Sequence, residues 1–277
     1  MKKFLFILIF CINLLAEERI ITLSPSINEI VFALGVGKNV VANTNFCDYP
    51  EESKNVRKIG GYNNISLEKI LKLKPTVVIG QDYDEKLNSN LKALGIKTLI
   101  YKTNTINTIQ NTINDLGDFF DKKDKAKELN MNITNALNSL NSIVENKKFL
   151  IVISPQTTLS NQIYITGNYI YFEDVIKASG NQNAYSSKNH AQPVVNTEKI
   201  INMNPDIIVL LTPFLEGDKK SQNEIIKIWK DLPINASKND NIYTIDKLYA
   251  GIPSHRIEFF IKDFRKILEN VRDKKLQ

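Results

Sequence analysis

The sequence predicts an α/β fold made of two Rossmann-like lobes that one long, rigid α-helix joins. Three observations support this fold class. Short apolar runs alternate with helix-length amphipathic segments, a helical stripe occupies the middle of the chain, and one helix–strand unit recurs at a constant offset. Such alternation is typical of parallel sheets with helices on their faces.

The composition agrees with a globular protein. Of the 277 residues, 43% are hydrophobic and 24% are charged, which excludes a disordered chain, a collagen-like repeat and a polytopic membrane protein. The formal net charge is +6, but most basic residues are lysines spread evenly among acidic ones. Proteins that bind nucleic acid favour clustered arginines and stacking aromatic rings, so we expect no nucleic-acid partner.

Residues 1–16 have the pattern of a cleaved signal peptide. Two lysines precede the apolar stretch Phe4–Leu15, which is too short to span a bilayer, and Ala16 stands before two glutamates. We therefore expect cleavage after Ala16. Lipid attachment at Cys11 is the alternative, but it usually needs a small preceding residue, and Phe10 is bulky.

The N-terminal lobe is predicted over residues 17–120. Its apolar runs predict strands, and the amphipathic segments between them predict helices. The strands are Arg19–Leu23, Asn39–Ala42, Thr76–Gly80 and Lys97–Tyr101, and the helices are Ile27–Leu34, Leu67–Leu73 and Asp84–Leu94.

A linking helix is predicted over residues 121–147. Apolar residues recur there at steps of three and four from Ala126 to Val144, without any Gly or Pro from Lys122 to Asn146. At 1.5 Å per residue, such a helix would be about 37 Å long. That length suits a rigid connection between two lobes better than a crossover within one lobe. A coiled-coil seam would need a longer, less Ala-rich stripe.

The C-terminal lobe is predicted over residues 148–277 and repeats the α/β alternation. The expected strands are Phe149–Ser154, Ile207–Leu211 and Asn241–Ile245, and the expected helices are Phe172–Ala178, Thr197–Met203 and Ser254–Val271.

An internal repeat supports the division into two lobes. Residues 66–80 align without a gap on residues 196–210, and Glu68, Lys69, Ile70 and Pro75 recur as Glu198, Lys199, Ile200 and Pro205. Each copy has the pattern of a helix cap, a short helix, a turn that Pro ends and a buried strand. One supersecondary unit therefore occurs once per lobe.

At these residues the sequence resembles the periplasmic binding proteins of iron–siderophore, haem and cobalamin importers. The similar blocks are Ile20–Gly35, Asn45–Pro50, Val56–Ile70 and Leu73–Pro75. The resemblance implies two lobes joined by one long helix, with a ligand held in the cleft between them. It also implies a monomeric periplasmic protein that delivers a metal chelate to an ABC permease dimer with its ATPase.

Candidate ligand-binding residues follow the predicted strands. Ligands of open α/β sheets bind at the carboxyl ends of the strands, and in the first lobe those loops carry Ser24, Tyr49, Tyr62 and Tyr83. Aromatic faces offer a flat macrocycle or catechol a large contact area. The resemblance places Tyr49 and Tyr62 where cobalamin binders of the family have cleft aromatics. Each ring could instead be an ordinary, partly buried tyrosine.

In the second lobe we single out His190, Tyr249 and Arg256. The resemblance implies that His190 and Tyr249 could complete the shell of a ferric ion, only if the ligand is a ferric siderophore; a surface role is the alternative for His190. Imidazole and phenolate both suit ferric iron. His255 and Arg256 open the last predicted helix, where either could meet an acidic edge of the ligand.

The sequence favours no catalytic function. It has no G-x-S-x-G motif, and Gly35–Lys38 lacks the earlier glycine of a phosphate-binding loop. Two histidines and one mature cysteine do not form a clustered metal site, so we expect no resident cofactor. After cleavage Cys47 remains alone, without a disulfide partner, and we expect a small, semi-buried residue there.

Glu68 and Glu198 are the candidate permease-docking residues. A carboxylate in the first turn of a helix favours the helix dipole, but that does not require the same residue in both lobes. The resemblance implies that each glutamate meets an arginine of one permease subunit.

The favoured ligand is cobalamin or another corrinoid, because the blocks at Cys47–Pro50 and Gly61–Tyr62 resemble that branch. A ferric siderophore or haem is the alternative ligand, and a secreted sensor or storage protein without a permease is the alternative function.

Overall fold

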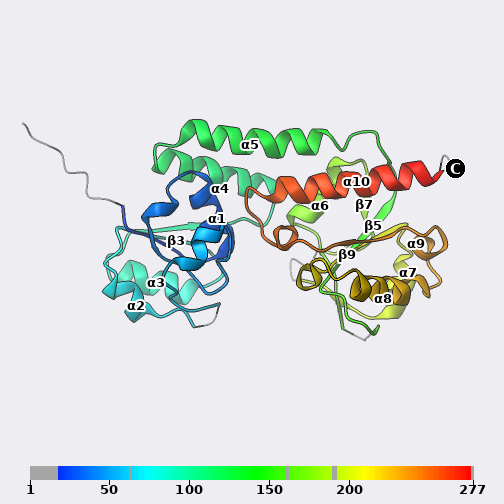
Figure 1. The fold of residues 1–277 in the computed structure, drawn as a ribbon, viewed down its shortest axis with the longest axis horizontal. Helices are drawn as coiled ribbons and strands as arrows, with labels where there is room; N and C mark the ends of the chain where they lie inside the picture. Colours follow the sequence, from blue (N-terminus) through cyan, green and yellow to red (C-terminus); the bar gives the residue numbers. More distant parts are fainter. Residues whose placement is uncertain (1–17, 63, 160–161, 189–191, 276–277) are drawn as a thin grey trace, which may run out of the picture.

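The computed structural model describes residues 18–62, 64–159, 162–188 and 192–275. The predicted signal peptide and Cys11 lie outside these residues. Figure 1 shows two lobes side by side, with the long helices α5 and α10 running along one side of both.

The N-terminal lobe is built on a parallel four-stranded sheet in the order β2-β1-β3-β4. Its strands are β1 (Ile20–Thr22), β2 (Val40–Ala42), β3 (Val77–Gln81) and β4 (Thr98–Tyr101). Its helices are α1 (Pro25–Ala33), α2 (Leu67–Lys72), α3 (Glu85–Ala93) and α4 (Ile106–Phe119). The sequence pattern predicted all of them except α4, which begins with a capping box at Thr105.

The C-terminal lobe has a second parallel sheet in the order β10-β9-β5-β7. Its strands are β5 (Lys148–Ile153), β7 (Gln182–Asn183), β9 (Ile207–Leu211) and β10 (Ile242–Ile245), while β6 (Ile163–Tyr164) and β8 (Val194–Val195) form a small antiparallel pair. Its helices are α6 (Tyr171–Ala178), α7 (Thr197–Met203), α8 (Lys219–Lys230), α9 (Asn235–Lys238) and α10 (Ile257–Lys275).

The linking helix is shorter than the sequence predicts. Helix α5 spans Lys123–Asn138 and ends at Ser139, and the following residues form turns in which Ser142 has a φ of 59°. Asn and Ser side chains compete with helical hydrogen bonds; the Ser139 hydroxyl donates to the Ala136 carbonyl at 2.7 Å. Leu140 and Val144 are nevertheless buried, so the apolar stripe continues in a turn rather than in a helix.

The internal repeat is confirmed in three dimensions. Helices α2 and α7 begin at equivalent positions, after Ser66 and Asn196, and strands β3 and β9 follow at the same offset of 130 residues. The match extends to the backbone before each proline: Lys74 has a φ of 45° and Asn204 a φ of 44°. Both lobes therefore contain a side-chain cap, a short helix, a left-handed residue and a strand at equivalent positions.

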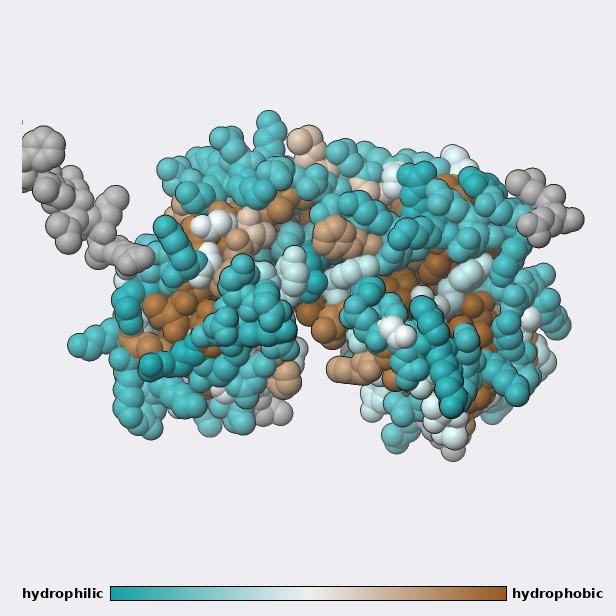
Figure 2. All heavy atoms as spheres, viewed as in Figure 1, coloured by the Kyte–Doolittle hydropathy of each residue, from teal (hydrophilic) through white to brown (hydrophobic). Residues whose placement is uncertain are grey.

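The largest hydrophobic core is continuous between the lobes. It includes Ile27 and Val77 of the first lobe, Ile133 of α5, and Phe149 and Phe264 of the second lobe. Figure 2 shows a hollow between the lobes on the side away from α5 and α10. Among the described residues, no helix combines the length and the apolar character that a membrane crossing requires.

Candidate ligand-binding site

The first lobe presents an aromatic wall formed by Phe46, Tyr62 and Tyr83. Phe46 follows β2 and Tyr83 follows β3, so both stand at the carboxyl edge of the sheet. The ring centroids of Phe46 and Tyr62 are 5.5 Å apart, and those of Tyr62 and Tyr83 are 5.7 Å apart. Tyr62 is 56% exposed, Phe46 52% and Tyr83 48%. Three adjacent, exposed rings make a surface suited to a flat ligand.

A buried polar network fixes the loop that carries Phe46. The Lys58 ammonium donates to Asn43 Oδ1 at 2.9 Å and to the carbonyls of Cys47 and Ser53. Asn43 in turn donates to Asn28 Oδ1 and to Ser53 Oγ. Such satisfied buried networks hold a segment in one conformation. Cys47 is fully buried in this loop, where burial raises the pKa of its thiol.

Two glycines allow the turn before Tyr62. Gly60 has a φ of +125°, and a Cβ there would lie 2.2 Å from the Asn64 carbonyl oxygen. A Cβ on Gly61 would lie 2.9 Å from the Phe46 ring. The aromatic wall therefore depends on a close approach of backbone to ring that other residues would hinder.

Ser24 and Tyr83 are held by hydrogen bonds within the protein. The buried Ser24 accepts a bond from the Ile27 amide as the cap of α1, and the Tyr83 hydroxyl donates to the Leu23 carbonyl at 3.2 Å. Burial and the neighbouring Tyr62 raise the pKa of Tyr83 to about 12. Tyr83 therefore stays a neutral phenol with one exposed face.

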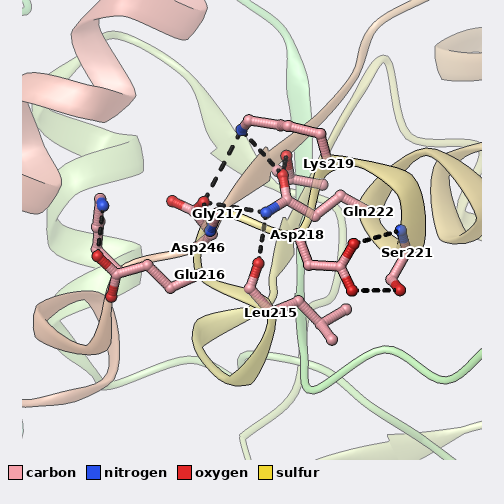
Figure 3. A network of polar contacts seen from close by, with 10 residues as sticks. Leu215, Glu216, Gly217, Asp218, Lys219, Ser221, Gln222 and Asp246 are labelled. Carbon is pink, nitrogen blue, oxygen red and sulfur yellow. Dashed lines mark hydrogen bonds and ion pairs between the residues drawn. The ribbon is translucent and has the colours of Figure 1, made fainter.

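The second lobe offers Phe214, which is 82% exposed in the loop after β9. A polar network holds this loop (Figure 3): Gln222 donates to the Leu215 carbonyl at 2.7 Å and to Asp246 at 3.0 Å, and the Gly217 amide also donates to Asp246. Lys247 pairs with Glu216 at 2.6 Å. The ring is thus exposed on a fixed loop, which lowers the entropy lost when it contacts a ligand.

Tyr249 lies at the carboxyl end of β10, but its hydroxyl has a partner. It donates a short hydrogen bond to the Asp263 carboxylate of α10. Burial and this carboxylate raise the pKa of Tyr249 well above its ordinary value. The Tyr249 hydroxyl therefore keeps its proton and donates it to Asp263, whereas a tyrosine that binds ferric iron would be a phenolate.

Arg256 is buried and paired with Glu29 of α1. Its Nε donates to Glu29 Oε2 at 3.0 Å, and its Nη2 contacts Glu29 Oε1. The guanidinium carbon lies 3.7 Å from the centroid of the Tyr49 ring. Tyr49 is 43% exposed, so the ring separates Arg256 from solvent on that side.

His190 lies outside the described residues, so its place in the cleft stays a prediction. Within the described ranges no group of three or more His, Cys, Asp or Glu side chains could hold a metal ion. Phe46 and Phe214 are not among the site residues that the sequence predicts. Both residues follow predicted strands, as the predicted tyrosines do. This position at the end of a strand could have identified them as site residues.

Glu68 and Glu198 occupy equivalent places as the second residues of α2 and α7, and both are exposed. Their surroundings differ. Glu68 Oε1 is 2.5 Å from the ammonium of Lys72. The residue equivalent to Lys72 is Asn202, and no ion pair to Glu198 occurs in the described part of the chain.

A family model described as periplasmic binding protein matches residues 20–249. The vitamin B12-binding protein of Vibrio vulnificus (strain CMCP6) is 41% identical over 75 residues, but this alignment spans only 26% of the present chain and 28% of that protein. The vitamin B12-binding protein of Vibrio campbellii (strain ATCC BAA-1116) is 25% identical over 93% of this chain and 92% of its own length.

Solved structures share the fold over nearly the whole chain. The S. aureus protein IsdE complexed with heme is 25% identical, covers 91% of this chain and 99% of its own, and has a TM-score of 0.72. The two-lobe α/β architecture predicted from the sequence is therefore confirmed.

Proposed function

The chain belongs to the periplasmic binding protein family, and from this premise we propose that it is the substrate-binding component of an ABC importer that captures a metal chelate between its lobes. The observation that carries this proposal is the wall of Phe46, Tyr62 and Tyr83 at the carboxyl edge of the first sheet. Phe214 on the second lobe supports it, because an exposed ring on a fixed loop is otherwise unfavourable in water.

We favour cobalamin or another corrinoid as the ligand. A haem or ferric siderophore presents carboxylates or catecholates that arginine recognises well, but Arg256 is already paired with Glu29. Ferric iron favours a phenolate, but the Tyr249 hydroxyl donates to Asp263. Two similar proteins are named for vitamin B12. Haem is the alternative ligand, because the similar protein IsdE is complexed with heme.

A titration separates these ligands. Purified mature protein is mixed with cyanocobalamin, haemin and a ferric catecholate in turn, and the visible spectrum is followed. We expect saturable binding of cyanocobalamin at one site and weaker binding of the other two. If only haemin or only the catecholate binds tightly, the ligand belongs to that class and is not a corrinoid. If none of the three binds, the proposed function is refuted.

We further propose that the protein is periplasmic and that Glu68 and Glu198 dock it on the permease dimer in the membrane. Their equivalent positions in the two lobes support a pseudo-twofold contact, one lobe to each permease subunit. Replacing both glutamates by arginine should abolish chelate uptake by cells and leave the affinity in solution nearly unchanged. Normal transport by the double variant would refute the docking role. A lack of chelate uptake even with the wild-type protein would favour the alternative of a sensor or storage protein without a permease.

A further inference from the structure

A buried ion pair connects the lobes next to the cleft. Glu29 belongs to α1 of the first lobe, and Arg256 precedes α10 of the second. Their side chains are 2% and 9% exposed, and Ser254 donates a further hydrogen bond to Glu29 Oε2. A buried ion pair is weak evidence for stability, since desolvation offsets most of the attraction. The position of the Glu29–Arg256 pair between the lobes therefore points to a role in placing the side chains around it.

Arg256 lies between two of the cleft tyrosines. Its guanidinium carbon is 3.7 Å from the ring centroid of Tyr49 in the first lobe and 5.9 Å from that of Tyr249 in the second. Both distances are within the range of cation–π attraction. One guanidinium thus contacts an aromatic residue from each lobe while Glu29 fixes its plane.

The backbone and the ring of Tyr49 have different contacts. Its backbone carbonyl accepts a hydrogen bond from Asn28, the neighbour of Glu29, at 3.1 Å. A cavity of about 150 Å³ lies beside the ring, lined by residues that include Glu29, Phe32 and His255. The ring therefore has room to turn if the guanidinium no longer stacks on it.

We propose that Glu29 and Arg256 are positioning residues of the cleft, which set the placement of Tyr49 and its spacing from Tyr249 without touching the ligand. This inference rests on the proposed function and reassigns Arg256, which the sequence suggested as a ligand contact. A lysine cannot replace Arg256, because only the planar guanidinium pairs with both carboxylate oxygens and stacks on a ring.

The first test needs no ligand. Tyrosine rings are labelled with ¹³C, the Tyr49 signal is assigned with Tyr49→Phe, and the spectra of Arg256→Lys and the wild type are compared. The control is Arg265→Lys, which alters an exposed ion pair with Glu269 on α10. We expect the Tyr49 signal to move toward that of a freely rotating tyrosine in Arg256→Lys only. An unchanged Tyr49 signal in a folded Arg256→Lys protein would overturn the proposal.

The second test is a double-mutant cycle on cyanocobalamin affinity. Arg256→Lys should weaken binding about tenfold in the wild type but less than about twofold in Tyr49→Ala, because the ring it positions is then absent. A full tenfold loss in both backgrounds would show that Arg256 touches the ligand itself, which contradicts the proposal. If the wild type binds no chelate, the proposed function fails, while the ring signals still decide the positioning role.

Discussion

Tyr62 is the central residue of the aromatic wall, since its ring contacts both Phe46 and Tyr83. Tyr62→Ala should therefore weaken chelate binding by about 1–3 kcal/mol, the usual effect of truncating a packed aromatic anchor. Isothermal titration with cyanocobalamin measures this. Met131→Ala is the control, because it removes an equally exposed apolar side chain from α5. Equal affinities of Tyr62→Ala and the control would remove Tyr62 from the site.

His255 should make stability depend on pH. Its Nδ1 is buried without a hydrogen-bond partner among the described residues, and burial, with the nearby Arg256 and Lys125, lowers its pKa from 6.5 to about 4. Below pH 6.5 the unfolded chain binds a proton that folded His255 takes up only near pH 4. Stability is therefore lost as the pH falls through this window, by about 2–3 kcal/mol from this residue.

Urea unfolding of the wild type and His255→Gln at pH 7 and pH 4.5 measures that loss. Other titrating groups contribute equally to both proteins, so the difference between the two pH dependences belongs to His255. We expect the variant to lose less stability on acidification. Parallel losses in the two proteins would contradict the buried, neutral imidazole.

At the scale of elements, α2 and α7 are equivalent in backbone but not in charge. Lys72 partly neutralises Glu68, whereas Asn202 stands beside Glu198. Lys72→Asn should therefore strengthen docking on the permease by up to about twofold at low salt, since exposed i,i+4 pairs are worth about 0.3–0.5 kcal/mol. Binding to the permease complex in nanodiscs measures it. Lys69→Asn is the control, because Lys69 forms no ion pair in the described chain. Weaker docking of Lys72→Asn would contradict the model of a partly neutralised Glu68.

Sequence patterns predict the bounds of some helices and strands but not of others. Strand β9 and helix α7 have the predicted bounds, because their apolar patterns end at a cap or a Pro. The end of α5 was predicted nine residues too late, because Leu140 and Val144 continue the apolar spacing after the helix has ended. The spacing of apolar residues shows which residues are buried, but not whether they lie in a helix. Only the Asn- and Ser-rich composition around residues 138–142 indicated that the helix ends there. Likewise the tyrosines of the first wall were predictable from their loops, whereas the Arg256–Glu29 pair joins residues 227 positions apart, which no local pattern reveals.

At the scale of the whole molecule, the lobes should move little on binding. The largest core runs from Ile27 through α5 to Phe264. Other contacts join the lobes too: Asp174 of α6 accepts a hydrogen bond from the Ile106 amide of α4 at 2.8 Å. Rotation of one lobe would break these contacts. Small-angle scattering with and without cyanocobalamin should give nearly the same radius of gyration, and a large decrease would contradict the rigid connection.

One chelate should bind between the lobes and contact both the aromatic wall of the first lobe and Phe214 of the second. The most direct measurement is a titration of cyanocobalamin into the wild type, Tyr62→Ala and Phe214→Ala, with melting temperatures recorded for all three. We predict one site per chain and a clear loss of affinity in both variants at unchanged stability. Full affinity in Phe214→Ala beside a loss in Tyr62→Ala would place the ligand on one lobe alone and contradict binding between the lobes.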